Sequence, residues 1–218
     1  MEPWWRGQSP PSDPASRGGP VRVLTGTVRA QDLAADDTIA RTSTAGLSPL
    51  YFFRAHTIGV DVRLDDTHLA VEWSEFDSCH FRQRVKPVLN AAGFAAQGSF
   101  GSRPAVYRGC TFERVRFKTL GGFTSGKALF EGCTFLNCRW EGHFAYDTDL
   151  VGCRFIGRMN GCVWGVRSEP TATQPVRRNL ISGNDFSEAQ LTENIGWRAD
   201  FPLDDQLWPA GYVPLPDR

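Results

Sequence analysis

The sequence predicts an all-β chain in which short strands stack as the coils of a solenoid. The composition includes 22 Gly, 14 Pro and 15 Phe but only two Met, which favours many strands and turns over long helices. Five short segments of one pattern recur along the chain. The distances between these segments suggest a structural unit of twenty residues, built of four fives.

The five segments align without gaps, and each opens with a large apolar residue and closes with Phe. They are FDSCHF (76–81), YRGCTF (107–112), FEGCTF (130–135), LVGCRF (150–155) and ISGNDF (181–186). Successive segments start 31, 23, 20 and 31 residues apart, as expected for units of twenty with occasional insertions. Equivalent residues of stacked coils lie about 4.8 Å apart, so the closing Phe rings should form one internal column.

The position two residues before the closing Phe is Cys in four segments and Asn in the fifth. This position also points inward, at a corner where a large side chain would collide with its neighbours. Cysteine acts there as a small hydrophobe, so we expect buried, reduced thiols. Structural zinc prefers closely spaced pairs such as C-x2-C, which the chain lacks, and we therefore expect neither a metal nor a cofactor.

Tandem fives of this kind resemble the pentapeptide-repeat family. The resemblance covers roughly residues 69–193 and departs from the family pattern in its Cys residues, where Ala is commoner, and in its long interruptions. It implies a right-handed quadrilateral β-helix with four fives in each turn. The right-handed sense agrees with the general handedness of parallel crossovers. Some members of the family imitate duplex DNA and protect or inhibit DNA gyrase.

Composition divides the rest of the chain into end regions and insertions. A solenoid needs atypical end units to cover its open core and its unpaired strand edges. The expected organisation is a disordered tail (1–20), a β-rich N-terminal cap (21–68), the β-helix (69–193) with insertions near 86–104, 119–127 and 165–178, and a C-terminal cap and tail (194–218).

Several function classes are disfavoured. The sequence has no apolar run of eighteen residues and no export signal, so we expect a soluble, cytoplasmic protein without a membrane partner. Lys plus Arg equals Asp plus Glu at 24 each, which makes a nucleic-acid partner unexpected. There are four His, no G-x-S-x-G motif and no phosphate-binding loop. We therefore expect no enzyme activity.

A basic cluster crowds the second and third repeat segments. Its members are Arg82, Arg84, Lys86, Arg103, Arg108, Arg114, Arg116 and Lys118. Residues 69–164 together carry twelve basic and eight acidic residues. Two interpretations stay open: the cluster is a solvated face that prevents strand aggregation, or it is a surface for an acidic partner.

These features predict a non-catalytic protein-interaction or scaffold protein whose partner is another protein. The alternative is a DNA-mimicking modulator of DNA gyrase, as in some relatives, although mimicry requires a long acidic rod. Recognition is commonly grafted onto loops of repeat scaffolds, and the insertion at 87–104 is the main candidate. Its candidate binding residues are Phe94, Phe100, Arg103 and Arg108. The same apolar residues could instead pin the loop to the coil, and a homodimer also remains open.

Overall fold

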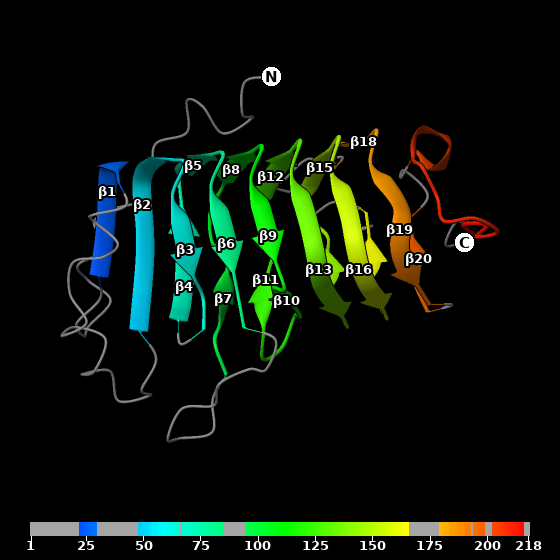
Figure 1. Cartoon of the computed structure of the whole chain (residues 1–218), viewed down its shortest axis with the longest axis horizontal. Coiled ribbons are helices and arrows are strands. Elements are labelled where there is room, and N and C mark those ends of the chain that lie inside the picture. Colours follow the sequence, from blue (N-terminus) through cyan, green and yellow to red (C-terminus); the bar gives the residue numbers. More distant parts are fainter. Residues whose placement is uncertain are drawn as a thin grey trace, which may run out of the picture.

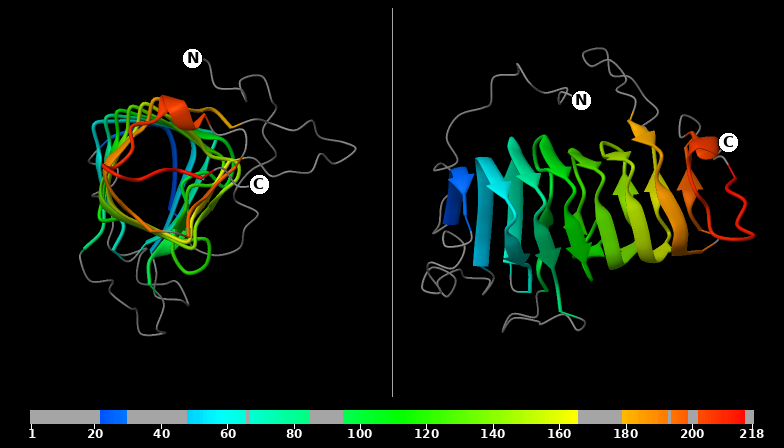
Figure 2. Two further views of the ribbon diagram at one scale, coloured as in Figure 1. Left: turned by 90° about the vertical axis from the view of Figure 1, so that its right-hand side faces the viewer. Right: turned by 45° about the horizontal axis from the view of Figure 1, so that its top comes forward.

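The computed structural model describes most of a single stack of parallel coils. The described residues are 22–29, 48–65, 67–84, 95–165, 179–192, 194–198 and 202–215. Figure 1 shows the coils following one another along the long axis, from β1 near the N-terminal end to β20 near the C-terminal end. The view along this axis shows one closed outline, with each coil lying over the previous one (Figure 2).

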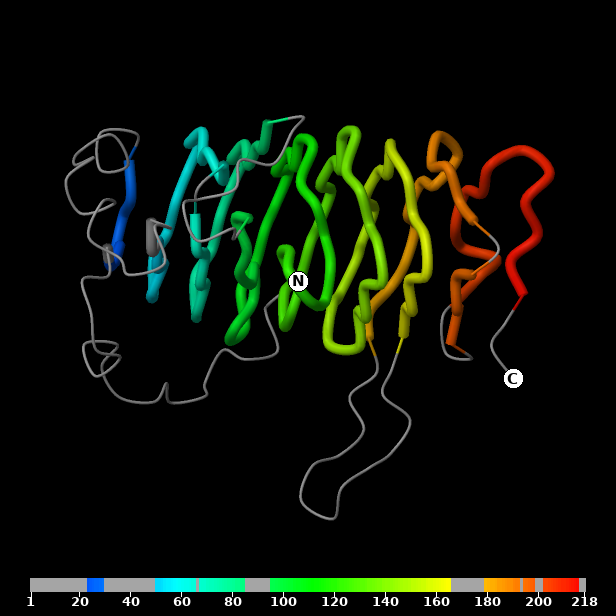
Figure 3. Tube along the Cα trace, turned by 90° about the horizontal axis from the view of Figure 1, so that it is seen from below, coloured from blue at the N-terminus to red at the C-terminus, as the bar shows by residue number. Residues whose placement is uncertain are grey.

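Short strands make up the walls of the stack, and Figure 3 shows how the chain winds from each coil into the next. In the described part of the chain, seventeen strands belong to one sheet and three to a second, and their pairing is parallel. The first coils contain β1 (Arg22–Val28), β2 (Ser48–Ile58), β3 (Asp61–Arg63), β4 (Thr67–Glu72), β5 (Ser74–Asp77) and β6 (His80–Arg82). The middle coils contain β7 (Gln97–Ser99), β8 (Ala105–Arg108), β9 (Thr111–Glu113), β10 (Arg116–Phe117), β11 (Phe123–Thr124), β12 (Ala128–Glu131), β13 (Thr134–Glu141) and β14 (Phe144–Ala145). The last coils contain β15 (Asp149–Val151), β16 (Arg154–Asn160), β17 (Val163–Trp164), β18 (Ile181–Ser182), β19 (Asp185–Leu191) and β20 (Gly196–Trp197).

The predicted column of phenylalanine rings is confirmed. Phe112 pairs in register with Phe81 on one side and with Phe135 on the other, and Phe135 pairs with Phe155. Adjacent rings from Phe81 to Phe186 are stacked, with centroids 5.1, 5.0, 4.7 and 4.5 Å apart. These rings are at most 1% exposed. Because Phe112, Phe135 and Phe155 each lie between two other rings, the column stabilises the stack through both burial and offset stacking.

The Ser or Gly of each repeat marks a sharp corner of the coil. Ser78 and Gly132 have φ values of 53° and 60°, in the left-handed region that non-glycine residues seldom adopt. The corner turns the following cysteine inward, where its thiol donates to a carbonyl of the previous coil. The Sγ of Cys133 lies 3.4 Å from the oxygen of Tyr107, and the Sγ of Cys153 lies 3.3 Å from that of Phe130.

The six cysteines are free and buried, including the four that occupy the repeat position. Asn184 takes over the same role in the last repeat, where its Nδ2 donates to the oxygen of Leu150 at 3.1 Å. Burial raises the pKa of the Cys162 thiol to about 11. Within the described ranges, no group of three or more His, Cys, Asp or Glu side chains is placed to hold a metal ion.

The N-terminal part differs from the separate cap expected for residues 21–68. Its strands are early coils of the same stack, since β1 pairs in parallel with β2, and β2 pairs in parallel with β4 and β5. Thr57 aligns with Phe76, and Val62 aligns with Phe81. The repeat frame is hidden in the sequence here because smaller side chains occupy the positions that are aromatic in later coils.

Part of the first expected insertion is also coil. Strand β7 pairs in parallel with both β4 and β11, so residues 97–99 form a wall and not a loop. Phe123 of β11 likewise pairs with Gly98, inside the insertion expected at 119–127. Residues 85–94 and 166–178 lie outside the described residues, as does the tail at 1–20.

The C-terminal segment covers the end of the aromatic column. A short 3₁₀ helix, η2 (Leu203–Asp205), precedes Leu207, which forms a parallel bridge with Asp185. The ring of Trp208 stacks on Phe186 with centroids 5.1 Å apart. This contact removes from water the ring face that the last coil would otherwise expose, as the end unit of a solenoid does. No helix among the described residues is long and apolar enough to cross a bilayer.

Candidate functional site

One buried cluster inside the coil has the atom types of a nucleophile and a base. The hydroxyl of Ser125 lies 2.8 Å from Nε2 of His143 and 2.5 Å from the hydroxyl of Thr148. Thr148 in turn donates to the backbone oxygen of Gly126 at 2.9 Å. Ser125 and His143 are 0% exposed, so no substrate from solvent reaches them in this conformation. The cluster is therefore a structural hydrogen-bond network inside an aromatic core.

The surroundings of His143 are apolar. Its ring lies 5.1 Å from that of Trp140 and 6.1 Å from that of Phe117, and Nδ1 has no hydrogen-bond partner. Burial lowers the pKa of this imidazole to about 3, because the charged form would lose its hydration. A neutral imidazole at physiological pH fits a packing role.

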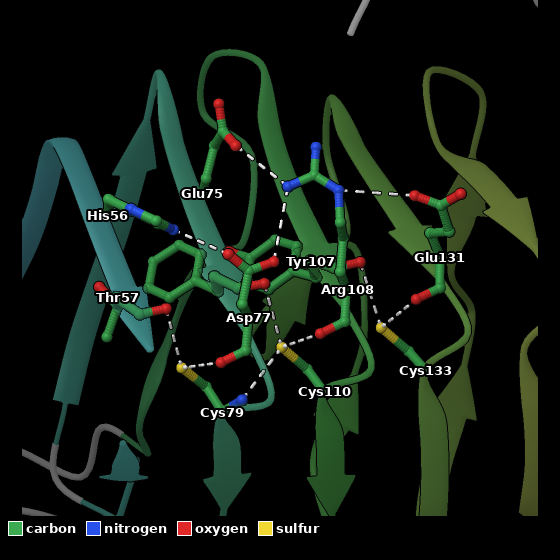
Figure 4. A network of polar contacts seen from close by, with 11 residues as sticks. His56, Thr57, Glu75, Asp77, Cys79, Tyr107, Arg108, Cys110, Glu131 and Cys133 are labelled. Carbon is green, nitrogen blue, oxygen red and sulfur yellow. Dashed lines mark hydrogen bonds and ion pairs between the residues drawn. The ribbon is translucent and has the colours of Figure 1, made fainter. Parts of the chain in front are cut away.

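On the outside of the coil, Arg108 forms the centre of an ion-pair network (Figure 4). Its guanidinium lies 3.0 Å from Glu75, 3.5 Å from Asp77 and 3.5 Å from Glu131. Asp77 also accepts a contact from His56 at 2.7 Å. These residues come from strands β2, β5, β8 and β12, which lie side by side. Arg108 alternates with the carboxylates of adjacent coils, so its hydrogen-bonding fork is already occupied.

Of the four candidate binding residues chosen from the sequence, the three that the structure describes do not converge. Phe100 was expected to be exposed in a loop, and this is wrong: it is 0% exposed and packs edge-on against Phe81 and Phe112, with centroids 5.5 and 5.2 Å apart. It follows β7 at a corner of the coil and points into the core. Arg103 is exposed at that corner, whereas Phe94 lies outside the described residues.

A groove on another wall brings together arginines that are far apart in sequence. It has a volume of about 300 Å³. Its lining residues are Gln83, Arg84, Ala95, Ala96, Arg114, Arg116, Gly121, Asn137, Arg139 and Glu141. The groove lies beside β10, where the side-chain oxygen of Gln83 accepts the backbone N–H of Arg116 at 2.8 Å.

Arginines on three successive coils extend from this groove along the wall. Arg116 pairs in register with Arg139, and Arg139 pairs in register with Arg158. Arg116 contacts Glu141 at 3.2 Å. Arg139 and Arg158 are exposed, and neither forms an ion pair within the described residues. Like charges in register on neighbouring strands disfavour each other, so this row attracts anions. We call Arg116, Arg139 and Arg158 the arginine row.

The structure therefore divides the basic cluster seen in the sequence. Arg84, Arg114 and Arg116 line the groove, whereas Arg108 faces another wall and Arg82 pairs with Asp61 at 2.7 Å. Arg139 and Arg158 were missed, because their proximity to Arg116 follows from coil stacking and not from sequence distance. The alternation of buried and outward positions around Trp140 is the signal that places Arg139 outside.

Comparisons with known proteins give little beyond this geometry. No protein-family model matches the chain, and no curated protein matches it. Among solved structures, the chain is similar to QnrB1, described as a plasmid-mediated fluoroquinolone resistance protein. The two are 12% identical with a TM-score of 0.23, and the match covers 85% of this chain and 76% of QnrB1.

Proposed function

We propose that this protein is a non-catalytic scaffold that holds an acidic partner protein against the arginine row. The observation that carries the proposal is the contrast between two walls. On one wall, the guanidinium of Arg108 meets carboxylates of the same chain on both neighbouring coils. On the arginine row, Arg139 and Arg158 are exposed without such partners in the described coils. A rigid β-wall can hold these charges at fixed spacing, which favours a specific partner.

The interior supports a scaffold role over a catalytic one. Side chains from all walls converge on the axis, and the rings of Phe81, Phe112, Phe135 and Phe155 occupy it from coil to coil. The Ser125–His143 pair is sealed from solvent. We infer that recognition takes place on the outer surface.

Charge reversal at two places on the surface, the arginine row and a corner of the coil, tests the proposal. Arg139→Glu with Arg158→Glu changes the arginine row, and Arg103→Glu with Lys127→Glu makes the same charge change at the corner before β8 and β12. Proteins captured from a native lysate are quantified by mass spectrometry for wild type and both variants. We expect the row variant to lose specific proteins that the corner variant retains. Loss in the corner variant alone would assign recognition to the corner near Arg103 and refute the proposal.

DNA mimicry directed at gyrase is the alternative function. It requires a continuous acidic stripe, but the described carboxylates alternate with cations: Asp77 contacts His56 and Arg108, and Asp61 contacts Arg82. We expect purified DNA gyrase to supercoil plasmid at an unchanged rate when this protein is added in equimolar amount. Inhibition at that ratio would favour the alternative instead.

A further inference from the structure

The groove beside the arginine row has the features of an anion-binding site. Arg84 and Ala95, the described residues on either side of positions 85–94, both line the groove. In this part of the wall, the backbone N–H of Arg116 in β10 donates to the side-chain oxygen of Gln83 and not to a carbonyl of a neighbouring strand. The result is a recess in an otherwise regular wall, with a volume of about 300 Å³.

Four guanidinium groups surround this recess, against one carboxylate. The arginines are Arg84, Arg114, Arg116 and Arg139, and the acid is Glu141. Three of the arginines have a carboxylate neighbour of their own: Arg84 contacts Asp65 at 3.2 Å, Arg114 contacts Glu113 at 2.6 Å, and Arg116 contacts Glu141 at 3.2 Å. Arg139 has none in the described part of the chain, and it therefore leaves the recess with an uncompensated positive charge.

Arginines on neighbouring coils add to the positive charge at the recess. Arg116 and Arg139 are register partners on adjacent strands, which places their backbones about 4.8 Å apart. Arg158 adds a further guanidinium one coil on. Like charges at this spacing repel, and an anion that bridges two guanidinium groups would turn that repulsion into attraction.

We propose that the recess binds a phosphate group, held between Arg116 and Arg139. This inference rests on the proposed function, because it names the group that a partner would present to the arginine row. A phosphate monoester carries a charge of about −1.5 to −2 at neutral pH and offers three acceptor oxygens. Two guanidinium forks can each donate a pair of hydrogen bonds to such a group. A carboxylate carries one charge and satisfies one fork.

The lining also disfavours a nucleotide. Among the described lining residues, the apolar contribution comes from Ala95, Ala96 and Gly121, and none is aromatic. A nucleobase needs a ring or another flat apolar surface on which to stack. Gln83 and Asn137 add neutral amides at the rim, which suit phosphate oxygens. The ligand chemistry is therefore the phosphate group, whether on a protein side chain or as free phosphate.

Binding is tested with the full chain and three probes at constant ionic strength. The probes are inorganic phosphate, a flexible Gly/Ser peptide with one phosphoserine, and the same peptide with Glu in that position. Affinity is measured by calorimetric titration for wild type, Arg139→Gln and the matched control Arg103→Gln. We expect saturable binding of a phosphate probe, about tenfold weakening by Arg139→Gln, and no change with Arg103→Gln. Circular dichroism confirms that both variants remain folded.

Comparison of the three probes shows whether the phosphate group belongs to a partner protein or to free phosphate. Tighter binding of the phosphopeptide supports a phosphorylated protein partner, and tighter binding of inorganic phosphate supports a free-anion site. Equal affinity for the Glu peptide, or no saturable binding of either phosphate probe, would overturn the proposal. The lysate experiment with the row variant has an independent readout. If the row variant loses partner proteins in the lysate experiment but neither phosphate probe binds in the titration, the scaffold function stands and only the phosphate proposal is refuted.

Discussion

Replacing His143 with glutamine tests how strongly the coil interior excludes charge. The imidazole is 0% exposed, and burial lowers its pKa to about 3 from an ordinary value of 6.5. The unfolded chain therefore takes up a proton at a pH where the folded chain does not. Stability is unaffected by this group above about pH 7.5 and falls as the pH decreases from 6.5 toward 3.

The size of the effect follows from the two pKa values. Each pH unit between them changes the free energy of unfolding by about 1.4 kcal/mol. Between pH 8 and pH 5, wild type should therefore lose about 2 kcal/mol through His143 alone. The variant His143→Gln keeps an amide that can bond to Ser125 and removes the titration. Carboxylates elsewhere titrate in both proteins, so their contribution cancels in the difference.

Urea unfolding at pH 8 and pH 5 measures this difference through tryptophan fluorescence. Trp140 and Trp164 lie within 5.1 and 6.5 Å of the His143 ring, so their emission reports on the core around it. His68→Gln serves as the matched control, because that side chain is exposed and forms no ion pair within the described residues. If wild type and His143→Gln lose equal stability between the two pH values, the core accommodates an imidazolium and the burial argument is refuted.

Three further predictions concern the packing of the coil. Phe135→Ala removes a ring stacked between two others and should destabilise the fold by about 3–5 kcal/mol in chemical denaturation; a loss below about 1 kcal/mol would show that the column collapses around the gap. Gly132→Ala places its Cβ in open space at a φ of +60° and should lower the free energy of unfolding by about 1–2 kcal/mol. Gly98→Ala would place its Cβ 2.0 Å from the oxygen of Leu69 and should lower the free energy of unfolding clearly more. Equal melting temperatures of the two variants would contradict this difference. A thiol reagent should label no cysteine rapidly in the folded protein and all 6 after denaturation, and stoichiometric zinc in the purified protein would contradict this packing role.

The periodicity of the sequence was enough to predict the stacking of the five repeat segments that close with Phe81, Phe112, Phe135, Phe155 and Phe186. Phe112 and Phe135 are ring neighbours because each coil contacts only the coils before and after it, so regular spacing along the chain becomes regular spacing in space. The same argument placed Cys110 and Cys133 inside, at the residue that follows each left-handed corner. Both features depend on the geometry within one coil and its nearest neighbours, which the repeated sequence pattern predicts.

The tertiary structure decided what the repeat frame did not mark. Phe100 follows Gly and Ser in a stretch that is loop-like in composition, and only the pairing of β7 with β4 and β11 turns it inward. The early coils were hidden because Thr57 and Val62 occupy aromatic positions. The arginine row depends on stacking as well. Its members are 23 and 19 residues apart in sequence, and strand register brings them together on one wall.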